Sequence, residues 1–225
     1  MIHSSTKDNW TRLEYLHSIA RQLYDSTKNS EFRDAQNAVG EPLKFCPETQ
    51  TLVQQESCMV GMIQVWAVVT LESLANHAIA ESFNNRTAAI IAIEYPDRVV
   101  KDFKGVKGQS ELGKKIAILQ DDLGKIYRDG GVEEREVSAI SMADDLSTIR
   151  NTVIHDKPFD YQTDNWEGDI EIKYYGNRIE ETPSARYQHL SEFFSNCDKV
   201  RESIKANSGH ECPLGGRTFQ SLVGD

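Results

Sequence analysis

The sequence predicts a mainly α-helical protein of one domain, with a small β-hairpin inserted before its last helix. Apolar residues recur at helical spacing over residues 8–157, whereas residues 169–181 alternate in steps of two. The composition is that of a globular protein, with 39% hydrophobic and 27% charged residues. The 225 residues suffice for one sizeable core, and we expect a single domain over residues 1–206.

The first two predicted helices are the longest. Residues 8–27 form an amphipathic helix, because apolar side chains recur there at helical spacing: Trp10, Leu13, Leu16, Ala20 and Leu23. Pro47 suits the first position of a second helix, and Glu48 follows where a negative charge favours the dipole. No residue stops this second helix before Phe83, and its many apolar side chains make it the central helix of the fold.

Three further segments complete the predicted helical core. Residues 86–93 form a short apolar helix before Pro96, and Ser110 caps a helix over residues 111–123. The stretch that begins at residue 132 forms the next helix, which ends close to His155 because Pro158 disfavours helical geometry at the residue before it.

The character of the sequence changes after Pro158. The turn residues Gly176-Asn177 predict a hairpin over residues 169–181. A last helix is expected over residues 183–206, started by Thr182-Pro183. Residues 207–225 lack periodicity and are expected to form a flexible tail.

Charge and composition narrow the function classes. A net charge of −10 argues against a surface that grips nucleic acid nonspecifically. The four cysteines are scattered and predict reduced thiols, with no metal site and no cofactor. The first residues lack the apolar core of a secretory signal, and the uncharged stretch 57–71 is shorter than a bilayer span, so we expect a soluble, cytoplasmic protein without membrane contact.

One short string, "IRNTVIH", carries residue types suited to chemistry on RNA. In a helix Asn151 and His155 share a face, and Arg150 reaches that face from the flank. The Arg–His spacing alone is a weak signal, because Arg12 and His17 have the same spacing. However, a leucine follows Arg12, whereas the polar Asn151 follows Arg150.

This string resembles the motif of the HEPN superfamily (higher eukaryotes and prokaryotes nucleotide-binding). In that motif an arginine is usually followed by Asn, Asp or His, and a histidine lies five to seven positions after the arginine. The resemblance covers about residues 8–157 as architecture and only Arg150, Asn151 and His155 as motif. It implies a helical homodimer that joins two motifs in one cleft. Many members are metal-independent endoribonucleases, often toxins or antiviral effectors, some with an antitoxin or regulatory partner; others are inactive binding modules.

The residue types fit such chemistry. A histidine near its ordinary pKa serves as acid or base at neutral pH, while an arginine fork matches phosphate oxygens. The RNA supplies its own nucleophile, the 2′-hydroxyl. We therefore expect His155 to transfer protons, Arg150 to hold the phosphate and Asn151 to orient one of them.

Ordinary structural roles compete with each assignment. Arg150 has a surface salt bridge to Asp145 or Glu136 as its alternative, and His155 has a helix C-terminal cap. Glu72 interrupts an apolar helix, so it either pairs with Arg150 and positions it or faces solvent. A basic run is either a solvated loop or the surface that steers RNA, and its candidate residues are Lys101, Lys104 and Lys107.

Overall fold

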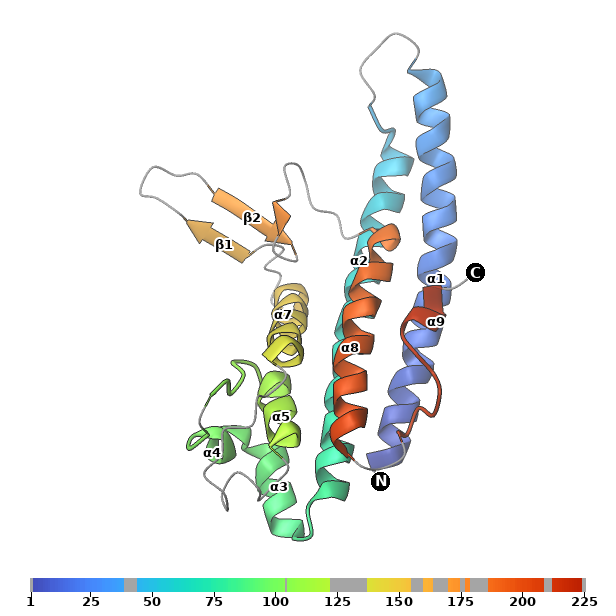
Figure 1. Cartoon of the computed structure of the whole chain (residues 1–225). Helices are drawn as coiled ribbons and strands as arrows, with labels where there is room; N and C mark the ends of the chain where they lie inside the picture. Colours follow the sequence, from blue (N-terminus) through green and yellow to red (C-terminus); the bar gives the residue numbers. More distant parts are fainter. Residues whose placement is uncertain are drawn as a thin grey trace.

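The computed structural model describes residues 2–38, 44–103, 105–121, 137–154, 160–163, 170–174, 177–178, 186–208 and 212–223. It is mainly helical, as the sequence predicts. Two long antiparallel helices, α1 (Ile2–Asn37) and α2 (Pro47–Ser82), run along one side, and α8 (Leu190–Ser208) packs against α2 (Figure 1). The predicted bounds of the central helix are confirmed to within a residue, and Pro47 occupies its first turn.

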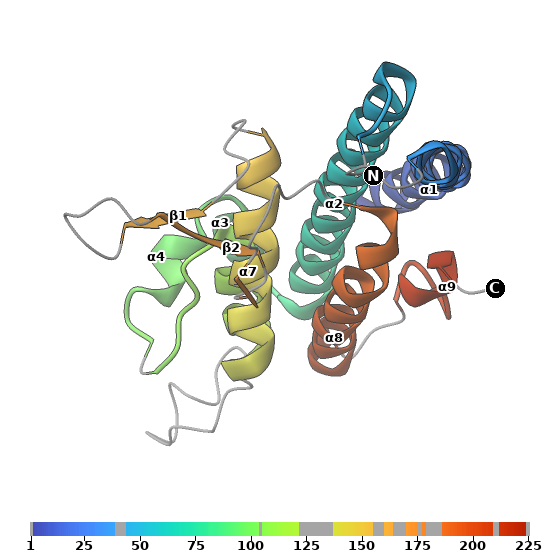
Figure 2. The same ribbon diagram turned by 90° about the horizontal axis from the view of Figure 1, so that it is seen from above.

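A second group of helices covers another face of α2. It comprises α3 (Arg86–Glu94), α4 (Pro96–Val100), α5 (Glu111–Gln120) and α7 (Val137–Ile154). Viewed from above, α2 has α7 on one side, α1 on the other and α8 against a third face (Figure 2). The side chains where these helices meet form the core, which includes Ile63, Leu71, Ile116 and Ile140, each fully buried.

The first helix is longer at both ends than the predicted 8–27. Its second half is held by polar contacts rather than by an apolar stripe. The hydroxyls of Ser30 and Thr49 are hydrogen-bonded at 2.6 Å in a buried position, and the Asp34 carboxylate accepts the backbone N–H of Cys46 at 2.9 Å. Apolar periodicity therefore could not reveal this part of the helix.

The start of α5 follows the prediction closely. Ser110 Oγ accepts the backbone N–H of Gly113 at 2.9 Å, which confirms the predicted cap. Asp144 of α7 fixes this cap in turn, because its carboxylate accepts from the backbone N–H of Gln109 (2.9 Å), the N–H of Ser110 (2.8 Å) and the Ser110 hydroxyl (2.6 Å). The loop before α5 is thus tied to the helix that carries Arg150.

Gly113 makes this arrangement possible, and we expect Gly113→Ala to destabilise the protein. A Cβ atom there would lie 2.1 Å from Asp144 Oδ1, and three hydrogen bonds prevent that carboxylate from moving away. Overpacking of this kind costs about 1–3 kcal/mol, which thermal denaturation would record as a fall in Tm of roughly 2–10 °C. Gly216→Ala is the matched control, since no atom lies within 4 Å of its Cβ position. An unchanged Tm for Gly113→Ala would contradict the prediction.

The region between α7 and α8 contains three short strands. β1 (Asp160–Thr163) pairs antiparallel with β2 (Ile170–Tyr174), and β2 pairs antiparallel with β3 (Asn177–Arg178). The sequence predicts two strands around Gly176-Asn177, so β1 is additional. Asn177 belongs to β3 and pairs with Tyr174, while Gly176 lies outside the described residues.

The last long helix begins later than the predicted residue 183. Arg186 has an extended backbone, and the 3-10 turn η2 (Tyr187–His189) precedes α8. Buried polar contacts favour this geometry: Glu56, which is fully buried, accepts from Arg186 Nε and from the Tyr187 backbone N–H, both at 3.0 Å. Glu31 accepts from the same guanidinium at 2.8 Å. Thr182-Pro183, the predicted start, lies outside the described residues.

The prediction of a flexible tail is wrong for residues 212–223. Phe219 is fully buried, and its ring packs edge-on to Trp10 at a centroid distance of 5.2 Å. The short helix α9 (Gln220–Val223) follows it. An isolated aromatic residue has no periodicity, so apolar spacing does not reveal that this segment returns to the core.

Among the described helices, α2 is long and apolar enough to cross a membrane by length and composition alone. The expectation of a protein without membrane contact stays a prediction. Of the most apolar window, 56% is buried inside the protein, and a central core helix meets the same criterion.

Candidate functional site

Arg150 of α7 is held by a residue from the central helix. Its Nη1 atom donates a hydrogen bond to Glu72 Oε1 of α2, and the two charges form an ion pair. The Arg150 side chain is 19% exposed and the Glu72 side chain 18%, so the pair lies at the rim of the core with access to solvent. Arg150 pairs with Glu72 rather than with Asp145, and Glu136, the other acidic residue that the sequence suggests, lies outside the described residues.

Asn151 is the second residue that fixes the arginine. Its Oδ1 atom accepts from Arg150 Nε at 3.2 Å and from Nη2 at 3.1 Å. The guanidinium is therefore bound on two edges, by Glu72 on one and by Asn151 on the other. Because Asn151 is exposed, a phosphate group that approaches from solvent could take its place on the Nε–Nη2 edge.

Only some of the other predicted site residues lie in the part of the chain that the structure describes. His155 follows Ile154, the last residue of α7, and lies outside the described residues, as does Lys104. Lys101 and Lys107 meet in the loop after α4, where Lys107 Nζ donates to the Lys101 carbonyl at 2.7 Å. Lys101 Nζ also lies 3.8 Å from Asp102 Oδ2, and this exposed ion pair contributes little to stability.

Two helices approach closely beside the site. A Cβ atom on Gly61 of α2 would lie 3.2 Å from Cγ1 of Val153, which shows how tightly α7 packs there. Apolar side chains remain exposed around this contact: Met62 at 42%, Val153 at 38% and Ile154 at 56%. The sequence carries a signal for such exposed apolar residues, because α2 has apolar residues on every face and the core cannot cover all of them.

Arg12 and His17, which share the Arg–His spacing, have structural roles. The Arg12 guanidinium lies over the Trp66 ring at 4.9 Å. His17 is buried, and its Nε2 atom is hydrogen-bonded to the Tyr187 hydroxyl at 2.8 Å. Burial, followed by the nearby charge of Arg21, lowers the pKa of His17 and favours the neutral imidazole. His17 is therefore a core histidine.

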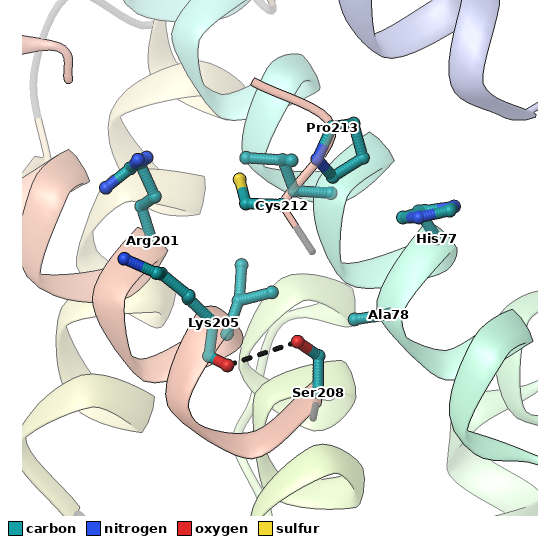
Figure 3. A pocket seen from close by; sticks show the side chains of 9 residues that line it. His77, Ala78, Arg201, Lys205, Ser208, Cys212 and Pro213 are labelled. Atoms are coloured by element: carbon teal, nitrogen blue, oxygen red, sulfur yellow. Dashed lines mark hydrogen bonds between the residues drawn. The ribbon is translucent and has the colours of Figure 1, made fainter. Parts of the chain in front are cut away.

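A shallow pocket lies elsewhere, between α2, α8 and residues 212–213 (Figure 3). His77 of α2 lines it and is 4% exposed. Its two cationic neighbours from α8, Arg201 and Lys205, both pair with Glu202. Of the predicted site residues that the structure describes, none lines this pocket.

In the part of the chain that the structure describes, no three His, Cys, Asp or Glu side chains gather in a way that could hold a metal ion. No protein-family model, curated protein or solved structure matches the chain. The assignment of a function therefore rests on the residues themselves.

Proposed function

We propose that the protein is a metal-independent endoribonuclease of toxin or defence type, with composite sites at a dimer interface. The observation that carries this proposal is the arrangement of Arg150. A phosphate-binding arginine must be charged, oriented and reachable, and here Glu72 and Asn151 orient a guanidinium that solvent still reaches. The decisive experiment is cleavage of labelled RNA by the purified protein in the presence of EDTA.

Each residue has one role in the proposed reaction. The RNA 2′-oxygen attacks the adjacent phosphorus, its proton passes to a base, and the 5′-oxygen leaves with a proton from an acid. His155 carries out proton transfer, and Arg150 binds the phosphate oxygens as negative charge grows on them. Glu72 and Asn151 act through Arg150 and are positioning residues.

A second copy of the chain is the partner that this site requires. One chain supplies one histidine of the motif, whereas the reaction needs both an acid and a base. On α2 the exposed Met62 and the half-buried Val65 and Val69 follow helical spacing down to Glu72, which contacts Arg150 of α7. We call this set, with Val153 and Ile154, the open face. An apolar face beside the arginine is suited to a symmetric contact that brings two motifs together.

We expect light scattering to give twice the 25.4 kDa mass of one chain at micromolar concentration. Met62→Asp should convert the dimer to monomers and abolish cleavage, because the new carboxylate would be buried without a partner. Phe32→Asp is the matched control, since Phe32 is 63% exposed on α1 and lies outside the open face. A single-chain mass for the wild-type protein would exclude the dimeric site.

Glu72 offers a test of the positioning of Arg150. Glu72→Ala should lower the cleavage rate by about 10- to 100-fold, because a misplaced phosphate-binding group costs rate even when it is still charged. Glu72→Gln, which keeps an oxygen acceptor, should recover part of that loss. Thermal stability should change by less than about 1 kcal/mol, as for other partly exposed ion pairs. If Glu72→Ala cleaves RNA like the wild-type protein, Glu72 does not position Arg150.

The second candidate is a non-catalytic helical module that binds a nucleotide, an RNA or a protein. The same arginine supports it, because a guanidinium held by Glu72 binds phosphate whether or not cleavage follows. Failure of the wild-type protein to cleave any RNA, together with binding that Arg150→Ala removes, would favour this module over the enzyme.

A further inference from the structure

The segment 212–223 is attached to the rest of the protein as a bound peptide would be. Its anchor is Phe219, which is fully buried between Trp10 of α1 and Phe194 of α8. The Phe219 ring is edge-on to Trp10 and lies 6.0 Å from the Phe194 ring, between centroids. Trp10 and Phe194 come from two helices, so the aromatic site exists in the bundle independently of the segment.

Side chains of α8 bind the backbone of the segment. Asp198 accepts the backbone N–H of Phe219 at 2.8 Å with one carboxylate oxygen and that of Gln220 at 2.9 Å with the other. A carboxylate in this place caps the first turn of α9 and stabilises its positive end. One turn further along α8, Arg201 Nη2 donates to the Gly215 carbonyl at 3.0 Å (Arg201 is labelled in Figure 3).

These contacts involve two buried side chains, Leu214 and Phe219, and several backbone groups. Residues 215–217 and Ser221 are exposed, and Leu222 and Val223 are only partly buried. The helix α9 has four residues, too few to be stable without Asp198. A segment with two buried side chains and a capped helical turn is bound through a small number of replaceable contacts.

We propose that the groove formed by Trp10, Phe194, Asp198 and Arg201 is a peptide-recognition site, occupied here by the chain's own segment 212–223. Its partner is a protein segment with an aromatic residue at the start of a helical turn. Figures 1 and 2 place α9 on the side of α8 that faces α1, with α7 on the opposite side. A bound partner would therefore leave Arg150 accessible, and the site does not depend on ribonuclease activity.

The strength of the interaction can be bounded. A tethered segment experiences an effective concentration of about 1 mM, so a Kd of about 10–100 µM for the free peptide corresponds to roughly 90–99% occupancy by the tethered one. The groove of the wild-type chain is then mostly filled. A partner segment competes with it, and its apparent affinity falls by about 10- to 100-fold.

The test uses the full chain with Phe219→Ala as the receptor and a fluorescein-labelled peptide of residues 212–223 as the probe. Fluorescence anisotropy should give a Kd of about 10–100 µM, and the wild-type chain should bind the peptide at least about 10-fold more weakly because its groove is filled. The same peptide with Phe219→Ala should not bind. Asp198→Asn in the receptor should weaken binding, since two charge-assisted hydrogen bonds lose strength.

Two outcomes would overturn the proposal. The first is failure of the Phe219→Ala chain to fold, or to bind the peptide more tightly than the wild-type chain does. The second comes from hydrogen exchange of the unaltered protein. We expect the backbone amides of residues 219 and 220 to exchange when the segment detaches from α8. Their protection should be only about 10- to 100-fold, well below the protection of amides in α8. Equal protection of the segment and α8 would make the segment an integral part of the core.

Discussion

His155→Ala should cleave RNA about 10²- to 10⁴-fold more slowly than the wild-type protein, which is the usual loss when a positioned acid or base is removed. The protein should remain folded, with unchanged far-UV circular dichroism. Initial rates on a labelled RNA give the measurement. Activity that persists in His155→Ala would rule out this histidine as the proton-transfer residue.

The control for this variant is His189→Ala. His189 is exposed and belongs to η2 at the start of α8, so its removal tests a loss of imidazole without a loss of the site. His17→Ala is unsuitable as a control, although His17 has the same spacing from Arg12 as His155 has from Arg150. Its imidazole is buried and bound to Tyr187, and we expect its removal to reduce stability as well.

Arg150→Ala should lower the rate by about 10²- to 10³-fold, because it removes the donor that stabilises charge on the phosphate in the transition state. Arg150→Lys should recover little of the lost rate. A lysine lacks the guanidinium fork that binds two phosphate oxygens, and it lacks the Nε–Nη2 edge that donates to Asn151. Steady-state rates with the same RNA give the comparison.

Arg33→Ala provides the control for a general loss of positive charge. Arg33 is 62% exposed on α1 and pairs with Glu48 at 3.8 Å. Glu48 lies in the first turn of α2, far along that helix from Glu72. We expect its rate to match that of the wild-type protein. If Arg33→Ala and Arg150→Ala are impaired equally, the effect is one of net charge and Arg150 has no special role.

The sequence predicts those elements whose apolar spacing and capping residues lie within the element itself. The central helix is the clearest case, since Pro47 marks its start and the apolar residues continue to Ser82. Ser110 is another, because its hydroxyl caps the residue three positions later. Such interactions are local, so the order of residues specifies them directly.

Elements held by distant contacts could not be predicted in this way. The start of α8 depends on Glu56, which is 130 positions away from Arg186. The segment around Phe219 depends on Asp198 and on Trp10, at the other end of the sequence. Each of these is a single pair with no repeating pattern, and a tertiary structure is needed to identify the partner.

The candidate site shows both situations. Arg150 and Asn151 are neighbours, and their residue types alone suggest a role with phosphate. Glu72 is 78 positions away, and the sequence could mark it only as a polar residue in an apolar helix that requires either a partner or solvent. The fold decides between these possibilities by placing α7 against α2.

The most direct test of the central claim is the chemistry of cleavage by the wild-type protein in EDTA. Labelled tRNA and total RNA are incubated with the purified chain, and the ends of the products are determined. The account predicts products with a 2′,3′-cyclic phosphate and a 5′-hydroxyl, because the RNA 2′-oxygen is the nucleophile, and DNA of the same sequence should remain intact. Cleavage that EDTA abolishes and a divalent metal restores, or products that carry a 5′-phosphate, would contradict it.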